Sequence, residues 1–283
     1  MTADAPIPPP IVPQRPAAAP LRLEPNFWTA LRGVWLLTWR GNCTMRGLGM
    51  SAVALWALPL LAWVSGAPRA HHSDSWSLSA AYYHLVVDFY FFLVLPLVCV
   101  RSCGALIRDE LQADTLGFLL TRPARRAALV VVKYLSQTAW LMMLLLAQTV
   151  LLFCAGAARG VPNLASVLWI LLAAQAFAVP VWSALGLLFG LFTNRYIPAA
   201  LLYGVLVELG IGRIPTNINT LSMMRHLKAL LANNQTLRDL FDWTDQAVWL
   251  PIAALLVGTA LFVALSAALF TFREYHHNAE MQK

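Results

Sequence analysis

Residues 108–134 read RDELQADTLGFLLTRPARRAALVVVKY, a charged stretch that separates two long apolar segments. The apolar runs on either side, 82–107 and 128–156, are each long enough to cross a hydrocarbon core of ~30 Å, which takes ~20 helical residues. A charged, amphipathic connection between two such runs is typical of a loop at a membrane surface. We therefore expect this stretch to join two membrane-spanning helices.

The composition of the whole chain supports the same class. Hydrophobic residues make up 59% of the sequence and charged residues only 12%, whereas a soluble domain has roughly 25% charged residues. Runs this long must be helical, because each backbone polar group in lipid has to be satisfied within its own segment. The sequence predicts an all-α integral membrane protein with six transmembrane helices, at 47–65, 82–107, 128–156, 165–192, 197–212 and 248–271.

The termini flank this six-span domain, which covers 47–271. Residues 1–25 are rich in proline and predict a disordered lead, and residues 272–283 form a short tail. Between the lead and the first span, 26–46 predicts an amphipathic helix lying at the membrane interface. Its apolar stripe consists of Phe27, Leu31, Val34 or Trp35, and Trp39.

The arginines indicate the orientation. They are concentrated in the N-terminal segment, in the 108–126 loop and in the link near Arg195, whereas the short loops on the other side contain only Arg69 and Arg159. By the positive-inside rule, both termini and the 108–126 loop are predicted to be cytoplasmic. The positive net charge then reports topology, and we expect no nucleic-acid partner.

The loop at 213–247 is predicted to lie outside the membrane on the opposite side. It contains a helical stripe with two basic residues pointing away from it. We expect a helix lying on the surface, either with a role in gating or as a small extracytoplasmic subdomain without one. The stripe is Leu221, Met224, Leu227 and Leu231, and the basic residues are Arg225 and Lys228.

The pattern within 108–134 resembles the permeases of exporter-type ATP-binding-cassette (ABC) transporters, the type-2 membrane-domain family. The matching positions are Glu110, Thr115–Leu116, Leu119–Leu120, Pro123, Arg125–Arg126 and Lys133, and the departures are Asp114 and Gly117. In that family, this loop is a coupling helix that docks on the ATPase. The resemblance therefore implies an ATPase-coupling role for Arg108, Asp109, Glu110, Leu111, Leu116, Phe118 and Leu119.

The same resemblance implies the partners. ATP and Mg would be bound by a separate ABC ATPase, in two copies, and the permease would pair with a second copy of itself or a close paralogue, in a bacterial inner membrane. A phosphate-binding loop needs Gly-x-x-x-x-Gly-Lys-Ser/Thr, but none of the lysines Lys133, Lys228 and Lys283 follows a glycine. We therefore expect this chain to bind no nucleotide, no other cofactor and no metal, and not to be an enzyme.

Two acidic residues lie inside apolar runs, where an ionisable group costs on the order of 3 kcal/mol unless it is paired or hydrated. Asp88 and Glu208 are both predicted near the outer side, where they either border a translocation path together with Tyr90 or make structural hydrogen bonds. The aromatic residues around Asp88 have two interpretations, an interfacial belt or the lining of a path. They are Tyr82, Tyr83, Phe89, Tyr90, Phe91 and Phe92.

Other classes of function remain open at this point. Cys99 and Cys103 are one helical turn apart, but no neighbouring ligands complete a metal site, so packing between helices is the better interpretation. A membrane-embedded transferase would rely on His84 or Asp88. An ion-gradient-driven transporter would use Asp88 and Glu208, although the two halves show no evident repeat. A non-transporting assembly factor, driven by an ATPase and acting on an extracytoplasmic partner, would keep the same coupling loop.

Overall fold

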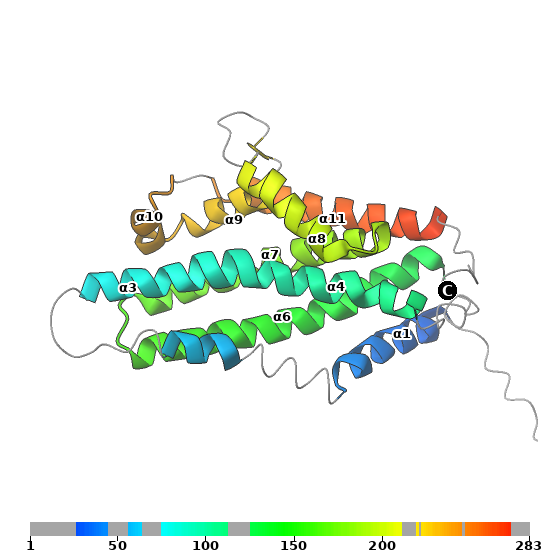
Figure 1. Ribbon diagram of the computed structural model, residues 1–283, viewed down its shortest axis with the longest axis horizontal. Coiled ribbons are helices and arrows are strands. Elements are labelled where there is room, and N and C mark those ends of the chain that lie inside the picture. Colours follow the sequence, from blue (N-terminus) through cyan, green and yellow to red (C-terminus); the bar gives the residue numbers. More distant parts are fainter. Residues whose placement is uncertain are drawn as a thin grey trace, which may run out of the picture.

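The computed structural model describes residues 27–44, 56–63, 75–112, 125–210, 219–220, 222–244 and 247–272. Every element within these ranges is helical, and most of them form one elongated bundle (Figure 1). Four helices in the described part of the chain are long and apolar enough to cross a membrane: Ser79–Arg108, Arg126–Ala158, Leu164–Phe192 and Trp249–Phe272.

These four helices confirm the predicted spans at 82–107, 128–156, 165–192 and 248–271 to within a few residues. The fifth predicted span corresponds to a shorter apolar helix, Tyr196–Glu208. Of the first predicted span, 47–65, the structure describes only the helical residues 56–63. The number of six spans therefore stays a prediction. So do the lead at 1–25 and the tail at 272–283, because the lead and all of the tail after residue 272 lie outside the described residues.

The centre of the bundle is a close contact between α4 (Leu95–Gln112) and α7 (Leu164–Phe192). Gly186 and Gly190 form a Gly-x-x-x-Gly pattern on α7, and small residues at this spacing let two helix backbones approach closely in a membrane. A Cβ atom on Gly186 would lie 2.6 Å from the Cα of Val100, and one on Gly190 would lie 2.7 Å from the Cα of Gly104. The two helices therefore pack backbone against backbone.

The N-terminal helix α1 (Phe27–Asn42) packs along α6 (Arg126–Ala158). Asn42 donates a hydrogen bond to Gln137 Oε1 at 2.8 Å, and the rings of Trp39 and Trp140 meet edge to face with centroids 5.2 Å apart. Val34, in the middle of the predicted stripe, is buried. The structure thus has a helix over the described part of 26–46, with Val34 buried and Phe27 exposed. Its place at a membrane interface stays a prediction.

The two ends of the bundle differ in what they hold (Figure 1). At one end, called the base here, α4 ends, α6 begins and Arg108 donates a hydrogen bond to the carbonyl of Thr193 after α7. At the other end, called the distal end, α3 (Ser75–His84) meets the link between α6 and α7, where Tyr83 donates to the carbonyl of Pro162 at 2.5 Å. The described ends of the 108–126 loop, Arg108 and Arg126, therefore lie at the base, and the link between α6 and α7 lies at the distal end.

Two helices of the predicted outer loop cover the distal end, α9 (Met223–Leu231) and α10 (Gln235–Phe241). The predicted stripe is correct in its described part, since Leu227 and Leu231 are fully buried. The prediction of a helix lying on the surface was incomplete, because α9 packs against α7 and α11 (Trp249–Phe272). Its contact with α11 is close: a Cβ on Gly258 would lie 2.9 Å from the Met223 methyl group.

Candidate functional site

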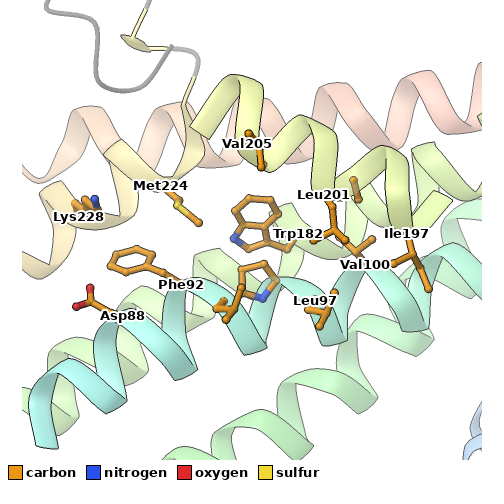
Figure 2. A pocket seen from close by; sticks show the side chains of 14 residues that line it. Asp88, Phe92, Leu97, Val100, Trp182, Ile197, Leu201, Val205, Met224 and Lys228 are labelled. Atoms are coloured by element: carbon orange, nitrogen blue, oxygen red, sulfur yellow. The ribbon is translucent and has the colours of Figure 1, made fainter. Parts of the chain in front are cut away.

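A pocket of about 470 Å³ opens between α4, α7, α8 (Tyr196–Tyr203) and α9 (Figure 2). This volume lies within the range of ~300–1,000 Å³ that is usual for small-molecule sites. Most of its walls are apolar, and several wall residues are about half exposed, so the pocket opens on the surface of the bundle. These half-exposed residues are Leu93, Leu97, Leu201 and Val205.

Both segments that flank the pocket have π-helical geometry. The first, η1, covers Leu85–Val94, and the second, η2, covers Gly204–Gly210. Stretches of π-helix are rare and frequently occur at functional sites, because the wider turn displaces the side chains from their usual positions. Here η1 supplies Asp88 and Phe92 to the pocket, and η2 supplies Val205.

One end of the pocket is charged. Asp88 lies there on η1, and Lys228 lies there on α9 (Figure 2). His84 holds one oxygen of the Asp88 carboxylate with its Nδ1 at 2.7 Å; the nitrogen donates, because a carboxylate only accepts. Lys228 places its Nζ 5.4 Å from the centroid of the Phe92 ring, within reach of a cation–π attraction. An acid and a base thus share the distal end of an otherwise apolar cavity.

The wall formed by α7 contributes one polar atom. Trp182 is only 4% exposed, and its indole Nε1 has no hydrogen-bond partner within the described part of the chain. Figure 2 shows its ring directed into the pocket, with the nitrogen on the side of Phe92. A buried N–H group without an acceptor costs ~1–3 kcal/mol. The pocket therefore presents an unused hydrogen-bond donor to whatever occupies it.

Glu208 lies at the start of α9 and does not line this pocket. Its carboxylate is 5% exposed and accepts three hydrogen bonds at the start of α9: from Ser222 Oγ at 2.6 Å, Met223 N at 3.1 Å and Met224 N at 2.9 Å. The first N–H groups of a helix have no partner inside the helix and favour a negative charge. Glu208 thus joins η2 to α9.

Tyr90 also lies away from the pocket, in the interior between η1, α6 and α7. Its hydroxyl donates to the carbonyl of Leu145 at 2.9 Å and lies 2.8 Å from Thr149 Oγ1. Thr149 in turn donates to Gln175 Oε1 at 2.7 Å. The three residues predicted for a translocation path are therefore not brought together: only Asp88 faces the pocket.

The surrounding aromatic residues correct one prediction. Tyr83, Tyr90 and Phe91 are at most 2% exposed, whereas Phe89 is 43% exposed. An interfacial belt needs side chains in contact with the lipid headgroups, so that interpretation is wrong for the buried three. Phe92 instead packs against Trp243, which is stacked on Phe241. These rings join η1 to the distal helices.

The predicted coupling element falls mostly outside the described residues. Leu116, Phe118 and Leu119 lie in 113–124, which the structure does not describe, and for Asp109, Glu110 and Leu111 only the helical backbone of α4 is described. Arg108 is placed, and it binds the carbonyl that follows α7. The predicted roles of these residues in coupling remain predictions.

Cys99 and Cys103 are both fully buried where α4 faces α7. Within the described ranges, no three His, Cys, Asp or Glu side chains are grouped so as to hold a metal ion. His84, proposed for a transferase, contacts Asp88 and the Phe241 ring.

Two residues that bring hydrogen-bonding groups to the pocket were not predicted from the sequence as parts of a site. Lys228 was interpreted only as the polar face of a surface helix, and Trp182 was not singled out. A tryptophan beside Pro180 and Ser183 inside an apolar run is a usable signal, because its N–H needs a partner that lipid does not provide. The direction of Lys228 was not predictable, because it depends on how α9 packs on the spans.

The chain matches the family model described as ABC-2 family transporter protein over residues 46–210, more than half of its length. It therefore belongs to the ABC-2 transporter family, as the resemblance of residues 108–134 predicted, and it is a multi-pass membrane protein. Subunits of this family form the membrane component of ABC transporters and work with an ATPase subunit. Comparisons with curated proteins and with solved structures gave no match.

Proposed function

We propose that this chain is the permease subunit of an ABC exporter, in which a separate ATPase subunit drives the movement of the spans through residues 108–124. The observation that carries the proposal is the family match over 46–210, which includes this segment and both helices attached to it. ATP and Mg would be bound by two ATPase copies in the cytoplasm. The base of the bundle then faces the cytoplasm of a bacterial cell, and the distal end faces outward.

The packing of the helices at the base supports the transmission of movement from residues 113–124 to the spans. Residues 113–124 connect α4 to α6, so a force on them acts on both helices. Because α4 and α7 pack backbone against backbone at Gly104, Gly186 and Gly190, a displacement of α4 also displaces α7. Close-packed helices of this kind move as rigid bodies.

The same displacement reaches α8. The ring of Tyr196 packs directly on Gly104, and a Cβ there would lie 2.6 Å from the Tyr196 Cε2 atom. Arg108 adds a hydrogen bond of 3.2 Å to the link between α7 and α8. Since α4, α7 and α8 line the pocket together with α9, their joint displacement relative to α9 on closure of the ATPase pair would change the shape of the pocket.

The exported molecule would pass beside Asp88, between this chain and a second permease chain. Asp88 is more than half exposed at the distal mouth of the pocket, where its charge can remain hydrated. Glu208 would act indirectly, through the position of α9.

The experiment is co-purification of the ATPase from native membranes. Replacing Phe118 with Ala or reversing the charge at Glu110 (Glu110→Lys) is expected to reduce the recovered ATPase by about tenfold or more, because a few central side chains dominate the affinity of an interface. The recovered partner is identified by mass spectrometry and by ATP binding. The amount and the elution volume of the permease itself should not change.

The matched control is Trp169→Ala. Trp169 is 72% exposed on α7 near the distal end, so its loss should leave ATPase recovery at the wild-type level. Wild-type recovery in both Phe118→Ala and Glu110→Lys would show that this segment is not where the ATPase docks.

A further inference from the structure

We propose that the pocket between α4, α7, α8 and α9 binds a phospholipid with a primary amine, such as phosphatidylethanolamine, from the leaflet at the distal end. The proposal concerns binding by the permease alone and does not depend on ATP-driven export. It rests on three features of the pocket: its apolar length, its paired charges and its unused indole donor.

The apolar length fits one acyl chain. The pocket runs along the second span from Asp88 to Val100, twelve positions that cover at most about 18 Å, since the rise is ~1.5 Å per residue in an α-helix and smaller in the wider turns of η1. One leaflet contributes about half of a hydrocarbon core of ~30 Å. The apolar part of the pocket includes Leu93, Leu97 and Val205. It therefore has the length and the polarity to accept an acyl chain that enters from the distal leaflet.

The charged end fits a zwitterionic headgroup. Lys228 supplies a cation for the phosphate, and the Asp88 carboxylate supplies an acceptor for an ammonium group. His84 fixes the carboxylate through the hydrogen bond of 2.7 Å. An acid and a base at one mouth favour a ligand that carries both charges over one that carries a single charge. An ammonium with N–H groups fits Asp88 better than a quaternary amine, which has none to donate.

The indole nitrogen provides the third contact. Trp182 lies between the charged end and the floor at Val100 (Figure 2). In a phospholipid, the ester carbonyls lie between the headgroup and the chains. Such a carbonyl is the acceptor that the buried Nε1 lacks, and the hydrogen bond would remove the cost of leaving this donor unpaired.

The test is native mass spectrometry of the full chain with three dioleoyl lipids: phosphatidylethanolamine, phosphatidylglycerol and phosphatidylcholine. Phosphatidylethanolamine is expected to be retained about tenfold better than phosphatidylglycerol, which has no amine for Asp88, and also better than phosphatidylcholine. Asp88→Asn should abolish the preference among the three lipids. Lys228→Gln should weaken all three, because all three have the phosphate.

Two further variants test the indole donor. Trp182→Phe keeps a ring in the pocket and removes the N–H, so we expect about fivefold lower retention of all three lipids, the loss of one hydrogen bond. The controls are Trp169→Phe at an exposed site and Arg225→Gln on α9, which is not among the pocket-lining residues. Both controls should bind as the wild type does.

Two results would overturn the proposal. The first is equal retention of the three lipids in the wild type, unchanged by Asp88→Asn and Lys228→Gln. The second concerns Leu97→Cys in a background without the native cysteines. If two copies of this variant form a disulfide in lipid, and the disulfide abolishes lipid retention, then a second copy of the chain occupies the pocket. Asp88 and Lys228 are exposed, so their variants should fold.

Discussion

Replacing Gly190 with Ala is expected to destabilise the bundle by several kcal/mol, because the new methyl group has no space. It would lie 2.7 Å from the Cα of Gly104 and also against the Gly104 carbonyl, and both belong to backbone that a side-chain rotation cannot move. Overpacking a close contact costs typically ~1–3 kcal/mol and more where backbone has to shift. We expect a lower thermal unfolding midpoint in detergent and loss of the monodisperse peak.

The matched control is the same substitution at Gly41. This glycine is also helical, but a Cβ there meets no heavy atom within 4 Å. Alanine is the better helix former by ~1 kcal/mol, so Gly41→Ala should keep or raise the unfolding midpoint. Equal midpoints for the two variants would show that α4 and α7 do not meet at Gly190.

Replacing Glu208 with Ala is expected to release α9 from η2. The substitution removes the acceptor of three hydrogen bonds. Their donors, the Ser222 hydroxyl and the first two N–H groups of α9, then lose this acceptor, at ~1–3 kcal/mol each where they stay buried. A local loss of about 3 kcal/mol corresponds to roughly 100-fold faster opening. Hydrogen exchange over 223–231 should speed up by that factor.

Two controls locate this effect. Glu208→Gln keeps the volume but exchanges one acceptor for a donor group, so exchange over 223–231 should fall between the wild type and the alanine variant. Asp239→Asn changes an exposed acid on α10 and should change nothing in α9. Unchanged exchange in Glu208→Ala would mean that the buried leucines of α9, and not the cap, hold the helix in place.

Features that depend on one segment of the chain were predictable from the sequence. The long spans were predicted to within a few residues, because bilayer thickness and hydropathy determine them. The stripe of α9 at Leu227 and Leu231 was predictable for a similar reason: periodicity within one helix identifies its buried face. The position of Asp88 in the distal half of its span also followed from the sequence.

Contacts between elements were not predictable in this way. Glu208 caps α9, which starts at Met223 and is separated from Glu208 by an intervening stretch of chain. The hydrogen-bond partners of Glu208 therefore depend on where α9 docks. Tyr90 and Phe91 lie in the π-helical segment η1, and the sequence did not show which side of this span faces the protein interior. The Gly-x-x-x-Gly pattern at Gly186 is present in the sequence, yet only the structure shows which helix it meets.

The most direct test of the proposed coupling combines a reporter at the pocket with the ATPase at the base. Lys228→Cys is introduced into a chain whose native cysteines, Cys43, Cys99, Cys103 and Cys154, are replaced by alanine. The complex with its ATPase is reconstituted in lipid, and a water-soluble maleimide labels the thiol with and without vanadate-trapped nucleotide. We expect a severalfold difference in labelling rate between the two states, and no difference when Phe118→Ala is added. Identical labelling rates in the intact complex, with ATP hydrolysis at its normal rate, would contradict it.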